Sequence, residues 1–168
     1  MLALAQIRQY PDPVLRLTAR EVDEFDDDLS GLVARLTALM EDANGVGLAA
    51  TQIGVLRRVF VFHEDEERVT AVVNPHIADA SEEEVTDDEG CLSLQGVLVP
   101  VARAGSVVLE GRDPEGAELR LVLADLPARV AQHELDHLDG VLIIDRTTPD
   151  RRREALARLR PRPVLGAR

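Results

Sequence analysis

The chain has 168 residues, of which 45% are apolar and only 2% aromatic, and its formal net charge is −12. This length suits one domain, spanning residues 1–168, with a core of aliphatic side chains. The acidic balance argues against direct DNA binding, no apolar run is long enough to cross a membrane, and the single cysteine suits the reducing cytoplasm.

The first third of the chain predicts one short and one long helix. The short helix begins at Val14, after a proline-rich turn at residues 11–13. The long helix is capped by residues 26–28, and its apolar residues recur at helical spacing from Leu29 to Met40. We expect it to end at Asn44-Gly45, because glycine tolerates the left-handed conformation that helix ends commonly need.

The remainder of the chain predicts a run of strands followed by two helices. The strands are expected at residues 57–62, 70–73, 97–101, 106–110 and 117–123, with a short one at 141–144. Asp125 is expected to cap a helix that ends at Gly140, and a C-terminal helix covers residues 149–159. Strands that come in runs indicate an α+β fold. We expect antiparallel strands packed around a central buried helix, with a further helix at the C-terminus.

The central helix carries the most informative motif, His133-Glu134-Leu135-Asp136-His137. Two histidines four residues apart lie on one face of a helix, where both can bind a single metal ion. The glutamate that follows the first histidine is placed to act as a general base without binding the metal. H-E-x-x-H therefore predicts a metal-dependent hydrolase, with Glu134 as its base.

A third metal ligand is expected at Cys91. No histidine follows His137, and the acids beyond it are poorly placed. Upstream stands the only thiol of the chain, within Glu89-Gly90-Cys91-Leu92-Ser93-Leu94. A thiolate is a strong ligand for zinc or ferrous iron, and three protein ligands leave an open position, as in a catalytic site.

The same helix face suggests an apolar pocket beside the metal. At about 100° per residue, Leu126 and Val130 lie within about 60° of His133. They are either ordinary core residues or the wall of a pocket for a compact apolar side chain. Arg129 is close to this face as well. It either points into the cleft, where it could narrow the pocket or pair with a substrate carboxylate, or extends to solvent.

Three segments in this order resemble the peptide deformylase family: Gly45-Val46-Gly47-Leu48-Ala49-Ala50-Thr51-Gln52, then Glu89 to Ser93, then Gln132 to His137. The resemblance covers about residues 6 to 147. It implies removal of the N-formyl group from the N-terminal formylmethionine of nascent polypeptides, with release of formate. The alternatives are a paralogue acting on other N-acyl peptides and a catalytically silent metal-binding protein of the same fold.

The resemblance also implies roles for individual residues. Cys91, His133 and His137 would bind one divalent ion, expected to be Fe²⁺, which Zn²⁺, Ni²⁺ or Co²⁺ can replace. The oxyanion would be bound by the Gln52 amide and the Leu92 backbone N–H. The remaining roles are substrate binding by Val46, Gly47, Leu126 and Val130, and bracing of the cysteine loop by a pair between Glu89 and Arg103.

Two charged regions lie outside these motifs. Residues 79–89 contain seven acids and predict a solvated edge or loop. The basic C-terminal helix and tail, residues 149–168, reverse the charge of the body, with seven arginines against one acid from Arg151 onward. By resemblance, this segment could dock on the ribosome, or it could merely balance an acidic body.

Overall fold

A computed structural model describes residues 4–159 of the chain. It contains three α-helices, α1 (Asp27–Asp42), α2 (Asp125–Leu138) and α3 (Pro149–Leu159). Short 3₁₀ helices are formed by η1 (Leu4–Gln6), η2 (Pro13–Arg16), η3 (Ala50–Ile53) and η4 (Ile143–Asp145). The strands are β1 (Gly47–Ala49), β2 (Val59–His63), β3 (Val69–Ala80), β4 (Glu84–Glu89), β5 (Val99–Ala104), β6 (Ser106–Arg112) and β7 (Glu118–Ala124).

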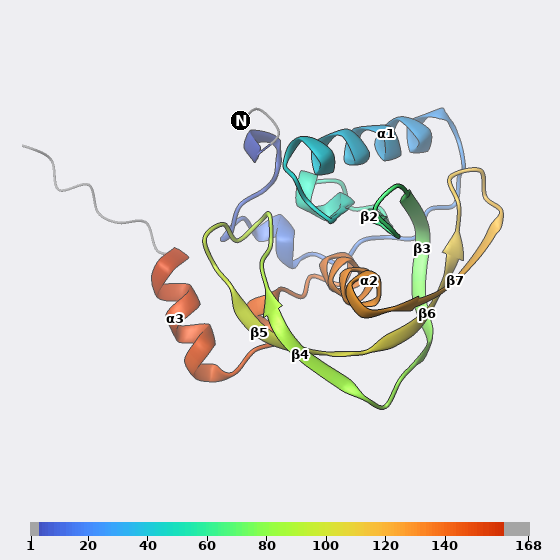
Figure 1. Ribbon diagram of the computed structural model, residues 1–168. Coiled ribbons are helices and arrows are strands. Elements are labelled where there is room, and N and C mark those ends of the chain that lie inside the picture. Colours follow the sequence, from blue (N-terminus) through green and yellow to red (C-terminus); the bar gives the residue numbers. More distant parts are fainter. Residues whose placement is uncertain (1–3, 160–168) are drawn as a thin grey trace, which may run out of the picture.

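The strands form two antiparallel sheets that surround α2. The larger sheet has the order β1-β2-β3-β6-β7, and β4 pairs with β5 in a separate hairpin. In Figure 1, α2 is seen nearly end-on in the middle, with strands curving around it and α3 at the outer side of β5. The predicted α+β fold, with a central buried helix and a C-terminal helix, is confirmed.

Each helix packs against its own part of the apolar core. Leu29 and Leu36 of α1 pack with Val61 of β2. Ala131 of α2 packs with Phe60 of the same strand, on the other side of the larger sheet. Small residues on α2 allow this close approach, and they bring its histidines into the interior of the protein. None of the helices in the described range 4–159 is long and apolar enough to cross a membrane.

The ends of α1 follow from local chemistry. The Asp26 side chain accepts a hydrogen bond from the Leu29 N–H at 2.9 Å, as a helix N-cap does. At the other end, the left-handed conformation that we expected of Gly45 is adopted by Asn44, with φ of 52°. Gly45 instead provides space, since a Cβ atom there would lie 2.8 Å from Leu92 Cδ1.

Two local predictions are wrong. Asp125 is not the cap of α2, because the N-cap position is Ala124, without a side-chain hydrogen bond, and Asp125 has φ of 55°. The chain enters the helix directly from β7. Residues 141–144 do not form a strand, because the Asp145 carboxylate accepts from the Leu142 N–H at 2.9 Å and closes the turn that becomes η4. An apolar run alone does not distinguish these conformations.

The acidic segment is more regular than a loop. Its second half forms β4, an exposed strand that pairs on one side with β5 from Glu84↔Ala104 to Glu89↔Val99. The prediction of a solvated edge is therefore confirmed for this part. Glu89 at the end of β4 is the exception, because its side chain is buried.

Candidate metal centre and cleft

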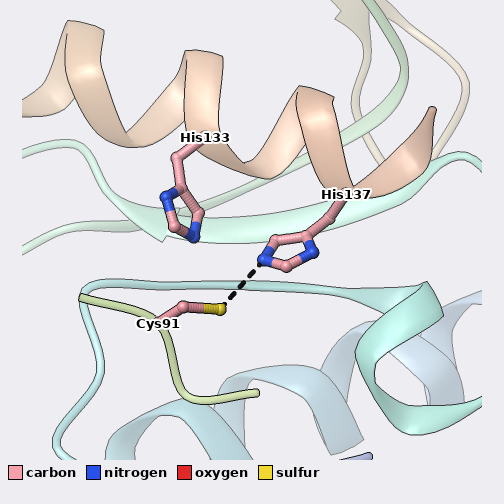
Figure 2. A group of neighbouring side chains, drawn as sticks. All are labelled: Cys91, His133 and His137. Carbon is pink, nitrogen blue, oxygen red and sulfur yellow. Dashed lines mark hydrogen bonds between the residues drawn. The ribbon is translucent and has the colours of Figure 1, made fainter. Parts of the chain in front are cut away.

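Cys91, His133 and His137 come together, with His137 buried and the other two half-buried. One ligand atom from each lies within 4.8 Å of the others, and Cys91 Sγ is 3.2 Å from His137 Nε2. Figure 2 shows both histidines projecting from α2 toward Cys91, which approaches from the loop after β4. The histidine rings meet edge to face, with centroids 4.9 Å apart.

This donor set suits a divalent metal ion. Cysteine sulfur and imidazole nitrogen are both strong ligands of such ions, and three protein ligands leave a further position open, as in a catalytic site. His137 Nδ1 is buried and has no hydrogen-bond partner in the described part of the chain. Burial lowers the pKa of His133, but Cys91, Glu89 and Glu134 outweigh this effect and raise the pKa well above its usual value. The side chains around His133 therefore favour a positive charge at this histidine.

Glu89 orients His133 for binding a metal through one particular nitrogen. His133 Nδ1 lies 3.0 Å from Glu89 Oε2. Burial alone would raise the pKa of Glu89, yet hydrogen bonds from His133 and Arg103 lower it well below its usual range. An ionised carboxylate only accepts hydrogen bonds, so Nδ1 carries a proton, and a metal ion that replaced the second ring proton would bind through Nε2.

Arg103 forms the pair with Glu89 that the resemblance implied, and it also connects the cysteine loop to the motif helix. It donates to both carboxylate oxygens of Glu89, at 2.9 and 3.0 Å, and to Asp136 at 2.6 Å. Arg146 in turn binds Asp136 at 2.6 Å. Glu89, Arg103 and Asp136 are buried, and buried charges need paired and hydrogen-bonded partners of this kind. The network holds β4, β5 and α2 in one arrangement.

Arg129 joins this network, and the alternative that it extends to solvent is wrong. It donates to Glu89 Oε1 at 2.8 Å and to the carbonyl oxygens of Val101 and Val85 at 2.9 and 2.6 Å. Arg129 lines the cleft, but its charge is already bound by Glu89 and by the β4–β5 hairpin. Helical spacing placed Arg129 near the cleft, whereas its partners come from strands far away in the sequence.

Gln52 is held with its amide nitrogen toward the cluster. Its Oε1 accepts from the Ala49 N–H at 2.9 Å, and its Nε2 donates to Ser93 Oγ at 3.1 Å. Nε2 is also 3.7 Å from Cys91 Sγ. The nearby backbone N–H of Leu92 donates to no group in the described range 4–159. The Gln52 amide nitrogen and an unpartnered backbone N–H thus lie beside the metal ligands.

Glu134 is buried beside the cluster, and its Oε2 has no hydrogen-bond partner within the described residues. Burial raises the pKa of Glu134 to about 7. A carboxyl group that titrates near neutral pH can both take and return a proton. Gly47 lies directly against this side chain, since a Cβ atom there would collide with the Glu134 carboxylate and lie 2.8 Å from Val130 Cγ1.

A single cleft of about 770 Å³ contains the predicted site, with all its residues except the buried His137 in the lining. Val130 belongs both to the core and to this lining. Leu126 is exposed, so it is not a core residue, and its position favours the pocket interpretation. Val46 and Gly47 line the same cleft.

Some residues with structural roles at the site were not predicted. Ser93 binds Gln52, and Gln132 bridges α2 to β5 through both the N–H and the carbonyl of Ala104, at 3.2 and 3.0 Å. Both residues lie inside the motifs that carry the family resemblance. Their position within those motifs indicated that Ser93 and Gln132 lie at the site. Their hydrogen-bond partners could not be identified without the fold.

Replacing Glu89 with glutamine should weaken metal binding by about 10- to 100-fold, the usual effect of losing a partner behind a histidine ligand. Glutamine would keep the size of the side chain, but it would leave His133 Nδ1 without an ionised acceptor. The measurement is a titration of metal-free protein with Zn²⁺ against a competing chelator. Glu84→Gln, on the exposed part of β4, is the matched control. Equal affinities of Glu89→Gln and the unaltered protein would contradict the role of Glu89.

Comparisons with known proteins identify close relatives. The family model described as polypeptide deformylase matches residues 4–153. A peptide deformylase of Acidothermus cellulolyticus is 48% identical, covering 95% of this chain and 87% of the relative. A peptide deformylase structure from Legionella pneumophila superposes with a TM-score of 0.87 at 37% identity, covering 91% of each chain. One from Ehrlichia chaffeensis in complex with actinonin gives 0.88 at 31% identity, covering 92% of this chain and 94% of that one.

Proposed function

The chain belongs to the polypeptide deformylase family, hydrolases that remove the N-formyl group from nascent polypeptides, and we propose that Cys91, His133 and His137 bind the metal ion on which this family depends. The observation that carries this proposal is the convergence of these three side chains with Glu134 and Gln52 on one cleft. We expect Fe²⁺, with Zn²⁺, Ni²⁺ or Co²⁺ as substitutes. When bound, the ion polarises a carbonyl group and lowers the pKa of water.

Glu134 acts as the general base and acid. In its ionised form it takes a proton from the water that attacks the formyl carbon, and it then delivers this proton to the departing amine of methionine. The raised pKa supports both steps, because a group that titrates near 7 exchanges protons readily at neutral pH. The products are formate and a peptide with a free N-terminus.

Gln52 and Leu92 stabilise the negative charge that develops on the formyl oxygen. The Gln52 amide is oriented in advance by Ala49 and Ser93, so little reorganisation is needed during the reaction. The Leu92 N–H is a second donor without a partner in residues 4–159. Fixed hydrogen-bond donors of this kind stabilise the developing charge most strongly in a site from which water is excluded.

The apolar lining binds the methionine side chain. Val46, Leu126 and Val130 line the cleft beside His133. Gly47 belongs to β1, which is the edge strand of the larger sheet, so its backbone groups can pair with an extended peptide. A side chain at position 47 would fill the space between this strand and Glu134.

One assay tests the function against its alternatives. Protein reconstituted separately with Fe²⁺, Zn²⁺, Ni²⁺ or Co²⁺ is given a formyl-Met peptide, an acetyl-Met peptide and an N-terminally blocked peptide without formyl. Formate release from the formyl-Met peptide, without turnover of the other two peptides, supports deformylation. Turnover of the acetyl peptide at an equal rate would indicate a wider N-acyl hydrolase. Metal binding without any turnover would indicate a silent protein.

Replacing Gln52 with alanine should lower kcat by about 10²- to 10³-fold, the usual loss when one oxyanion donor is removed. Metal content should not change, because Cys91, His133 and His137 remain. The measurement is steady-state formate release together with metal analysis. An unchanged kcat would show that Gln52 does not stabilise the transition state.

The whole chain, residues 1–168, is proposed to form one catalytic domain in the cytoplasm, with the basic C-terminal helix and tail docking on the ribosome. Arg151, Arg153 and Arg158 of α3 are exposed, which supports such contact, whereas residues 160–168 lie outside the described residues. Ribosome pelleting of the full chain and of a form ending at residue 159 provides the test. Equal co-sedimentation would contradict a role for the tail.

A further inference from the structure

A short segment near the N-terminus contacts both parts of the chain that carry the proposed oxyanion donors. The Arg8 backbone N–H donates to the carbonyl oxygen of Gln52 at 2.7 Å. The side-chain amide of the next residue, Gln9, donates to the carbonyl oxygen of Leu92 at 2.9 Å. Residues 7–10, the N-terminal bridge, therefore join the two donor segments to each other. The bridge lies outside the three motifs that carry the family resemblance.

The N-terminal bridge is anchored at both of its ends. Ile7 is buried in the core cluster that contains the apolar face of α1. Tyr10 packs against the core cluster formed by β5, η4 and α3, and its backbone N–H donates to the Ser93 carbonyl oxygen at 2.9 Å. Because both ends are held, the groups between them keep constant positions relative to the two donor segments.

The loop that carries the Leu92 N–H depends on contacts of this kind. Residues 90–98, between β4 and β5, form turns and irregular backbone rather than a helix or a strand. Within the loop, the Cys91 carbonyl oxygen accepts from the Leu94 N–H at 3.0 Å. The next carbonyl along the chain, that of Leu92, is held from outside by Gln9. Since peptide units are planar, holding both carbonyls restricts rotation of the unit that contains the Leu92 N–H.

The contact is made by the Gln9 amide nitrogen, and its orientation is set by two acceptors. Nε2 donates to the Leu92 carbonyl oxygen at 2.9 Å and to the Ile7 carbonyl oxygen at 3.2 Å. A side-chain amide has two N–H groups, so both are engaged, and a carbonyl oxygen could not donate in return to the amide oxygen. Gln9 is half-buried, which limits the competition from water for these bonds.

We propose that Gln9 is a positioning residue for the reaction, whose amide keeps the Leu92 backbone N–H in the direction in which it stabilises the oxyanion. This inference rests on the proposed function, since the Leu92 N–H is one of the two donors assigned there. Donors that are fixed in advance accelerate a reaction because they need no reorganisation when charge develops. Without the Gln9 amide, the Leu92 carbonyl turns toward water, and the loop has to be ordered again in each turnover.

Gln9→Met tests the role of the amide in the metal-loaded enzyme. Methionine resembles glutamine in length and volume, but it donates no hydrogen bond. We expect kcat for formate release from a formyl-Met peptide to fall about five- to tenfold, as the loss of one neutral hydrogen bond predicts, with KM unchanged. The affinity for Zn²⁺, titrated against a competing chelator, should not change, because Cys91, His133 and His137 are retained.

Two control variants separate positioning from stability and from the chemical change itself. Ile7→Val shortens a buried side chain of the same segment and leaves the Ile7 carbonyl in place. It should lower the unfolding temperature without changing kcat at a temperature where the protein is folded. Gln6→Met makes the same replacement at an exposed glutamine of η1 and should change neither quantity.

Three results would overturn the inference while leaving the proposed function intact. The first is a kcat of Gln9→Met equal to that of the unaltered enzyme. The second is an equal fall of kcat in Ile7→Val, which would show that stability alone is responsible. The third is a loss of Zn²⁺ affinity in Gln9→Met, which would show that Gln9 supports Cys91 instead. Failure of the unaltered protein to release formate from any formyl-Met peptide would contradict the proposed function itself.

Discussion

Glu134→Gln is expected to lower kcat for formate release by about 10²- to 10⁴-fold, the range that a general acid–base contributes. Glutamine has almost the same shape as glutamate, but it cannot take a proton from water or return one to an amine. Glu134 does not belong to the Cys91, His133 and His137 cluster, so the metal content should remain unchanged. The measurement combines steady-state kinetics with metal analysis of the same preparation.

The interpretation of Glu134→Gln depends on an intact fold. The carboxylate is buried with one oxygen unpartnered, and replacing it with a neutral amide removes a charge whose burial is costly. The variant should therefore be at least as stable as the unaltered protein in thermal unfolding. Glu118→Gln, on the exposed part of β7, is the control for the chemical change. Activity within tenfold of the unaltered enzyme would show that another group moves the proton.

The parts of the site that could be predicted from the sequence are those governed by local geometry. His133 and His137 are four residues apart on a helix, and this spacing alone brings them together. Asp26 caps α1 through a contact three residues away. Cys91 was found through chemistry, because the helix lacked a third ligand and the chain has only one thiol.

The parts that could not be predicted depend on pairing between distant segments. β1 is only three residues long, and its pairing with β2 decides its conformation. Arg129 was placed correctly by its angle on α2, yet its partner carboxylate is 40 residues away in the sequence. The apolar run at residues 141–144 is typical of a strand. The Asp145 side chain, beyond its end, accepts a hydrogen bond from the Leu142 N–H, and the segment forms a turn instead.

The resemblance and the structure contribute different evidence about the site. The resemblance assigned roles to Gln52 and Leu92, which their residue types alone would not suggest. The structure adds the reasons why these groups can act, such as the two hydrogen bonds that orient the Gln52 amide.

Cys91→Ala is expected to lose the metal ion. Two imidazoles would remain, but they would lack the negatively charged sulfur that makes a three-ligand site strong for zinc or ferrous iron. We expect affinity to fall by more than about 100-fold, the upper end of the loss seen when only a partner behind a ligand is removed. The measurement is the metal content after dialysis against a weak chelator.

The fold should survive this substitution. Cys91 is half-buried and forms no disulfide, and removing one sulfur atom costs little packing energy compared with removing a large side chain. Circular dichroism and thermal unfolding of metal-free protein, with and without the substitution, check this point. Full metal occupancy of Cys91→Ala would show that the ligand assignment is wrong.

The two substitutions together distinguish the metal site from the base. Glu134→Gln should keep the metal ion and lose turnover, whereas Cys91→Ala should lose both. Adding excess Fe²⁺ or Zn²⁺ should restore part of the activity of Cys91→Ala and none of the activity of Glu134→Gln. A structural role shared by both residues would predict parallel losses of stability instead.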